Sequence, residues 1–94
     1  MFVILVSYTK PVEIVDIYLP KHVEYLDTCY KKNYFIVSGP KNPRNGGVLI
    51  SQLKDRQQLE EIIKHDPYRM NNVADFEIIE FTPRVFHPDF SSFM

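Results

Sequence analysis

Several features that would narrow the function are missing from this sequence of 94 residues. A single cysteine, Cys29, leaves no partner for an internal disulfide and is typical of a reducing compartment. The formal net charge is −1, so no strong field attracts nucleic acid or an anionic membrane. The N-terminal run "MFVILVSYTK" is apolar over only about seven residues, too short for a membrane span and without the basic start of a signal peptide. We therefore expect a soluble, cytoplasmic protein that folds as one domain over residues 1–94.

Motifs for cofactors are missing as well. The histidines, acids and cysteine have no recognised metal-ligand spacing. Gly46 and Gly47 lead into a predicted strand rather than a helix, so they do not form a phosphate-binding loop. The same strand, "GGVLISQL", has no aromatic residue, which argues against an RNA-recognition module. We expect no metal, no organic cofactor and no nucleic-acid partner.

Enough apolar residues are present for a packed core, at 45% of the chain with 7 Phe and 6 Tyr. Pro20 should kink or split the first helix, Pro67 should end the second, and Asn45-Gly46 is typical of a hairpin turn. The pattern predicts strands over 2–8, 34–40, 47–53 and 75–82, and helices over 12–30 and 56–65. This β-α-β-β-α-β order indicates an α+β, ferredoxin-like fold with a four-stranded antiparallel sheet and two helices on one face.

The predicted strands are apolar on both faces, since Val3 and Leu5 alternate with equally apolar neighbours. Helices on one side would leave the other face bare, which is unfavourable for a monomer. Packing that face against a second copy is the simplest solution, so we expect a homodimer, with a higher homo-oligomer also compatible. The aromatic tail, residues 83–94, has no clear period and could pack on the partner subunit.

Two residues stand out as candidates for chemistry. His22 lies at the edge of the apolar stripe of the first helix, where it is either a general acid/base or a satisfied, half-buried side chain. Asp66 follows the second helix, although the negative end of a helix dipole disfavours an acid. It is therefore either held for function by Pro67, or it simply starts a turn.

Further polar groups end the second strand and occupy the following loop. Ser38 could donate a hydrogen bond into a cleft, or its hydroxyl could be satisfied by nearby backbone. Arg44 could hold a carboxylate or phosphate, or be an ordinary surface charge.

The ordered set "LPKHVEYLD", "FIVSGPKNPRNGGVLI", "HDPY" and "EIIEFTP" resembles the YCII-related (YciI-like) domain family over about Met1 to Pro83. The resemblance implies a dimeric α/β barrel of ferredoxin-like subunits, with a cleft that holds a histidine and an aspartate. These match His22 and Asp66, and the segment that lines the cleft matches Ser38-Gly39-Pro40. Some relatives act in the breakdown of aromatic compounds, including elimination of chloride from a chlorinated hydroquinone, and muconolactone isomerases share the barrel.

The resemblance favours a cofactor-independent enzyme. His22 would transfer a proton on a small cyclic or aromatic oxygenated substrate, and Asp66 would orient it by accepting a hydrogen bond. Ser38, Gly39, Pro40 and Arg44 would bind the substrate in an elimination or isomerisation. Two alternatives remain open: a module that binds a small molecule without turnover, and an accessory or structural dimer.

Overall fold

All 94 residues are described by a computed structural model, in which the strands and helices follow the predicted order. The elements are β1 (Phe2–Tyr8), α1 (Val12–Lys31), β2 (Phe35–Pro40), β3 (Gly46–Ser51), α2 (Arg56–Lys64), α3 (Pro67–Met70), β4 (Ala74–Glu80) and the 3-10 helix η1 (Pro88–Phe93). Where α3 lies the sequence pattern indicated only a further turn around residues 69–72, and the tail helix η1 was not predicted.

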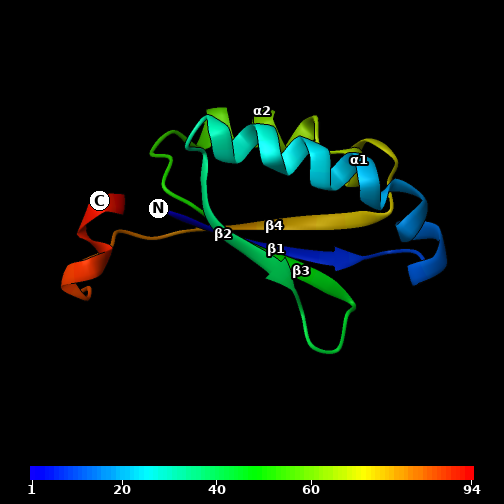
Figure 1. Ribbon diagram of the computed structural model, residues 1–94, viewed down its shortest axis with the longest axis horizontal. Coiled ribbons are helices and arrows are strands. Elements are labelled where there is room, and N and C mark those ends of the chain that lie inside the picture. Colours follow the sequence, from blue (N-terminus) through cyan, green and yellow to red (C-terminus); the bar gives the residue numbers. More distant parts are fainter.

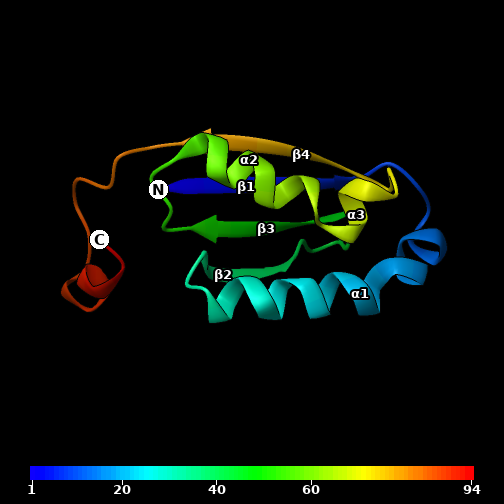
Figure 2. The same cartoon turned by 90° about the horizontal axis from the view of Figure 1, so that it is seen from above.

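The strands form one four-stranded sheet in the order β2-β3-β1-β4, and every neighbouring pair is antiparallel. This confirms the α+β, ferredoxin-like fold. The helices α1, α2 and α3 all lie on the same face of the sheet (Figures 1 and 2). The C-terminal segment extends beyond the end of the sheet and curls into η1 there (Figure 1).

The helix-covered face carries the core. On β1, Phe2, Ile4 and Val6 point to this face and are at most 4% exposed. The helix α2 begins after its N-cap Asp55, whose carboxylate accepts from the backbone N–H of Gln57 at 2.9 Å. Its apolar side packs onto the core through three buried residues, Leu59, Ile62 and Ile63.

The opposite face of the sheet has no helix over it (Figure 1). The strand registers place Val3 between Ile50 and Ile79, with Val37 next to Ile50. A row of β-branched side chains therefore crosses all four strands, and its two outer members, Val37 and Ile79, are 51% and 43% exposed. None of the helices combines the length and apolar character needed to cross a bilayer.

The first helix is not split at Pro20. It is continuous from Val12 to Lys31, although its first turns bend away from the remaining axis (Figures 1 and 2). Proline removes one helical N–H, which leaves the carbonyl of Asp16 without its helical partner, and the helix absorbs this loss by bending.

The predicted Asn45-Gly46 hairpin turn is wrong, although β2 and β3 do form a hairpin. A two-residue turn of that type needs positive φ angles, and neither residue has one. The strands are instead joined by a longer loop, residues 41–45, closed by a hydrogen bond from Lys41 N–H to the Gly46 carbonyl. Gly46 is required for a different reason: a Cβ atom there would lie 1.9 Å from the Val6 carbonyl oxygen.

Candidate active site

Asp66 starts a helix rather than ending one. It is the N-cap of α3, with extended backbone angles, and Pro67 occupies the first helical position. Its Oδ1 accepts from the backbone N–H of Tyr68 at 2.9 Å. Asp66 therefore follows the C-terminus of α2, as the sequence argument assumed, and it also caps α3, where an acid is favoured.

The same carboxylate oxygen reaches His22 on α1. His22 Nδ1 lies 2.8 Å from Asp66 Oδ1, and the two side chains are 13% and 4% exposed. A carboxylate accepts hydrogen bonds, so Nδ1 carries the hydrogen and Nε2 is left with its lone pair. The structure thus brings together two residues that are 44 positions apart in the chain.

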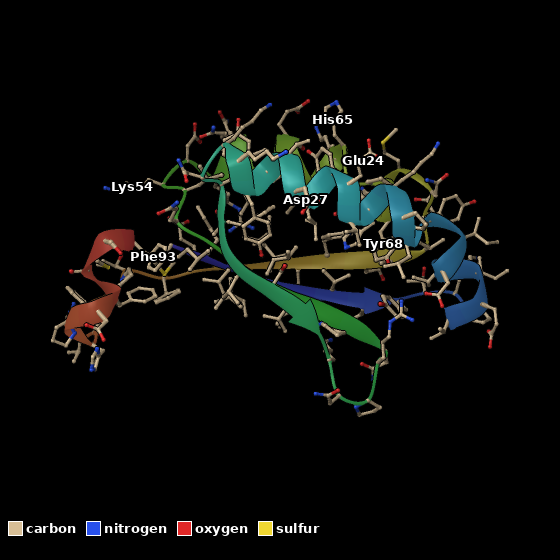
Figure 3. All side chains as sticks on the ribbon, in the orientation of Figure 1. Glu24, Asp27, Lys54, His65, Tyr68 and Phe93 are labelled. Carbon is tan, nitrogen blue, oxygen red and sulfur yellow. The ribbon has the colours of Figure 1, made fainter.

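Two tyrosine rings pack around the imidazole of His22, one directly and one through the other. The ring of Tyr68 stacks on His22 with a centroid distance of 3.8 Å and an interplanar angle of 7°. Tyr8, at the end of β1, meets Tyr68 edge-on at 6.0 Å. Figure 3 shows Tyr68 between α1 and the sheet, whereas the neighbouring His65 projects from the outer side of the helices. These contacts fix the ring orientation of His22.

A cleft of about 330 Å³ opens beside His22, near the low end of the usual range for small-molecule sites. It lies between α1 and the part of the sheet where β1 and β2 end and β3 begins. Five of the six site residues expected from the sequence line it, and Asp66 lies behind His22. The lining residues are Val6, Tyr8, Leu19, His22, Val23, Leu26, Ser38, Gly39, Pro40, Arg44, Gly46, Gly47, Val48, Leu49 and Tyr68.

Ser38 is held by a tyrosine rather than by backbone. The hydroxyl of Tyr30 on α1 donates to Ser38 Oγ at 2.6 Å. Since that hydrogen comes from Tyr30, the Ser38 hydroxyl keeps its own hydrogen for a group in the cleft. This arrangement is consistent with the expected role of Ser38 as a donor.

Arg44 is anchored at the mouth of the cleft. Its Nη2 donates to Asp16 Oδ1 at 2.6 Å, and its guanidinium lies 5.5 Å from the centre of the Tyr8 ring. The hydrogen bond from Arg44 holds the pKa of the Asp16 carboxyl below its usual range, and Asp16 raises the pKa of the guanidinium. Arg44 therefore combines a partly exposed ion pair to Asp16 with a place in the lining of the cleft.

The sequence interpretation did not single out Tyr8, Tyr30 or Tyr68. Tyr68 was visible in the quoted "HDPY", directly after the acid and the proline, but an aromatic residue there was given no role. No three His, Cys, Asp or Glu side chains lie together in a way that could hold a metal ion. The site consists of a histidine, its carboxylate, tyrosine and serine hydroxyls and one arginine around an apolar space.

The four-stranded antiparallel sheet and the helices on one of its faces define a small α+β protein of the ferredoxin-like class. A family model for the YCII-related domain matches residues 1–82, and the chain belongs to that family. Comparison with curated protein sequences gives no match.

One similar solved structure is 5-chloro-2-hydroxyhydroquinone dehydrochlorinase from Burkholderia phenoliruptrix AC1100, in complex with 2,5-dihydroxybenzoquinone. It superposes with a TM-score of 0.72, at 15% sequence identity, over 87% of this chain and 94% of the other. At this identity the likeness establishes the fold.

Proposed function

We propose that this protein is an enzyme that uses His22 to move a proton on a small, ring-shaped, oxygenated substrate, without a metal or organic cofactor. The observation that carries the proposal is the hydrogen bond from His22 Nδ1 to the buried Asp66 at 2.8 Å, beside a cleft. This bond frees Nε2 to act as a base, and the carboxylate stabilises the imidazolium once the proton has arrived. Asp66 is then a positioning residue.

The chemistry requires only one acid/base. His22 takes a proton from carbon next to a carbonyl or enol, and the electron pair moves toward the ring oxygen. In an elimination the pair returns to expel a leaving group; in an isomerisation the imidazolium gives its proton back at another carbon. In either reaction the atoms and electrons balance without a further reactant.

The size and walls of the cleft support a substrate of one ring. A volume of about 330 Å³ holds a single six-membered ring with oxygen substituents, and the walls are largely aliphatic. Ser38 and Arg44 supply polar groups at two sides of the cleft. The hydroxyhydroquinone of the similar dehydrochlorinase is a substrate of this class and is our choice for a first assay.

We also propose that two copies pack sheet to sheet. The row Val37, Ile50, Val3 and Ile79 is an apolar strip across the bare face, and a second copy would cover it. Ile50→Lys places a charge in this strip, so light scattering should report a monomer, whereas Asp27→Lys on the exposed side of α1 should stay dimeric. A wild-type monomer at micromolar concentration would contradict the proposal.

The function is tested by turnover of 5-chloro-2-hydroxyhydroquinone, followed as released chloride. His22→Ala should lower kcat by about 10²–10⁴-fold, the usual contribution of a positioned acid/base, with an unchanged circular dichroism spectrum. Asp66→Asn keeps the N-cap but removes the charge, so it should lower kcat while leaving KM nearly unchanged. His65→Ala, at an exposed histidine, is the matched control. Retention of wild-type turnover in His22→Ala would refute the proposal.

A further inference from the structure

One buried polar group in this protein has no partner. The hydroxyl of Tyr68 makes no hydrogen bond, although Tyr68 is only 3% exposed and lines the cleft. It is the only buried side-chain nitrogen or oxygen in this state. Folded proteins rarely leave such groups unpaired, and a site that awaits a ligand is one of the reasons they do.

Other tyrosines near the site show what a satisfied hydroxyl looks like. Tyr25 donates to the Ile62 carbonyl at 2.6 Å, and Tyr30 donates to Ser38 at 2.6 Å. Both bonds tie one element of the fold to another. No comparable hydrogen bond holds the Tyr68 hydroxyl, and the Tyr68 ring stacks on His22 and meets Tyr8 edge-on.

The surroundings of the hydroxyl favour an anion. The Arg44 guanidinium lies over the Tyr8 ring, which in turn abuts Tyr68. A polar interaction with Arg44 lowers the pKa of Tyr68, although the two groups do not meet in the geometry of a full hydrogen bond. Burial is the larger effect and raises the pKa of Tyr68 to about 12, so the hydroxyl carries its hydrogen at neutral pH. Asp16 occupies Nη2 of Arg44, and a guanidinium has five N–H groups, so donors remain for a ligand.

We propose that Tyr68 Oη and the Arg44 guanidinium form a subsite for an anionic ring oxygen of the substrate, such as an enolate, a phenolate or a ring carboxylate. This proposal rests on the function proposed above and adds the group that binds the substrate oxygen. Tyr68 is stacked on the imidazole, so an oxygen bound to its hydroxyl is held next to His22. The reacting carbon, one or two bonds away, then lies near Nε2.

This subsite would act during the reaction as well as in binding. As His22 removes the proton from carbon, the electron pair moves onto the ring oxygen, and negative charge develops there. Tyr68 and Arg44 donate to that charge in a largely apolar cleft, where fixed donors have their greatest effect. The proton resides on His22 and the charge on the bound oxygen until the leaving group departs or the proton returns.

The test compares Tyr68→Phe with Tyr25→Phe. Each substitution removes one hydroxyl, but only the Tyr68 hydroxyl is unpaired, and of the two residues only Tyr68 lines the cleft. Binding of 2,5-dihydroxybenzoquinone, an acidic enol that is anionic at neutral pH, is measured by calorimetry, and the Tm is measured without ligand. Tyr68→Phe should raise Kd about tenfold or more, since a charge-assisted hydrogen bond is lost, without lowering the Tm. Tyr25→Phe should leave Kd within about twofold and lower the Tm by roughly 4–8 °C, because it removes a hydrogen bond that ties α1 to α2.

Each contrary result has a definite meaning. An unchanged Kd in Tyr68→Phe overturns the subsite, and so does a wild-type protein that fails to bind the enol at millimolar concentration. A lowered Tm with unchanged Kd shows instead that the hydroxyl is structural, which also overturns it. If Tyr68→Phe weakens binding but His22→Ala retains turnover, the subsite stands and the proposed acid/base function fails.

Discussion

The helix-covered face of the sheet has two parts that differ in how they are filled. Under α2, Leu59, Ile62 and Ile63 belong to the same buried cluster as Phe2 and Ile4, and all five are at most 9% exposed. Under the middle of α1, by contrast, a cleft remains open beside His22. One part therefore holds the fold together, and the other leaves room for a ligand.

The polar groups of the two parts differ in the same way. In the packed part, the Ser51 hydroxyl is fully buried, donates to the Tyr34 carbonyl at 2.7 Å and accepts from the Leu53 N–H at 3.1 Å. At the cleft, the Tyr68 hydroxyl is buried and unpaired. A buried polar group without a hydrogen bond therefore indicates which part of this face serves function.

Glycines contribute to the open part. Gly39, Gly46 and Gly47 line the cleft, and at Gly47 a Cβ atom would approach the Gly39 carbonyl oxygen to 3.0 Å. The strands approach one another closely there and present no side chains at these positions. At the other end of the β2–β3 pair, in the packed part, the facing residues are Phe35 and Ser51, and both are buried.

The prediction with the largest expected effect on stability compares how tightly side chains pack under α2 and beside the cleft. Leu59→Ala removes a side chain that is 0% exposed, and we expect it to lower the free energy of unfolding by about 2–5 kcal/mol. Leu26→Ala, at a partly buried leucine that lines the cleft, should cost less than half as much, because Leu26 already borders open space. Urea unfolding measures both values. Equal losses would contradict the division into a packed and an open part.

A smaller effect concerns the unpaired hydroxyl at alkaline pH. The pKa of Tyr68 is raised to about 12 by burial, whereas an unfolded tyrosine ionises near pH 10. The stability associated with the protonated hydroxyl is complete below pH 10 and is lost as the pH rises through about 12. Between pH 9 and 11, Tyr68→Phe should therefore lose less unfolding free energy than the wild type, by on the order of 1 kcal/mol. Parallel losses in urea titrations of the two proteins would show that Tyr68 ionises normally.

Much of the fold was predictable because local pattern governs it. The apolar run of β1 was placed at its observed bounds, and the helical repeats over α1 and α2 were placed within a residue or so. A bend at Pro20 was one of the two predicted outcomes, and α1 bends there without splitting. The predicted hairpin turn was wrong, because Gly46 is required by the Val6 carbonyl rather than by a turn.

The site was predictable in part, and mainly through the family resemblance. Spacing alone did not decide whether His22 is an acid/base or a half-buried structural side chain, and the helix-dipole argument for Asp66 did not foresee that Asp66 caps α3. The resemblance paired the two residues, and the structure places them 2.8 Å apart. Arg44 and Ser38 were named as candidates, but the residues that hold them, Asp16 and Tyr30, were not.

The sequence by itself determined the order of strands and helices and the existence of two apolar sheet faces, because these follow from periodicities read over a few neighbouring residues. Only the tertiary structure decided that Asp66 caps α3 while it holds His22, that Tyr30 holds Ser38, and that the Tyr68 hydroxyl is buried without a partner. Each of these facts depends on side chains brought together from separate elements, and on whether a buried polar group finds a partner there. That outcome is fixed by how the helices pack on the sheet, which no local pattern specifies.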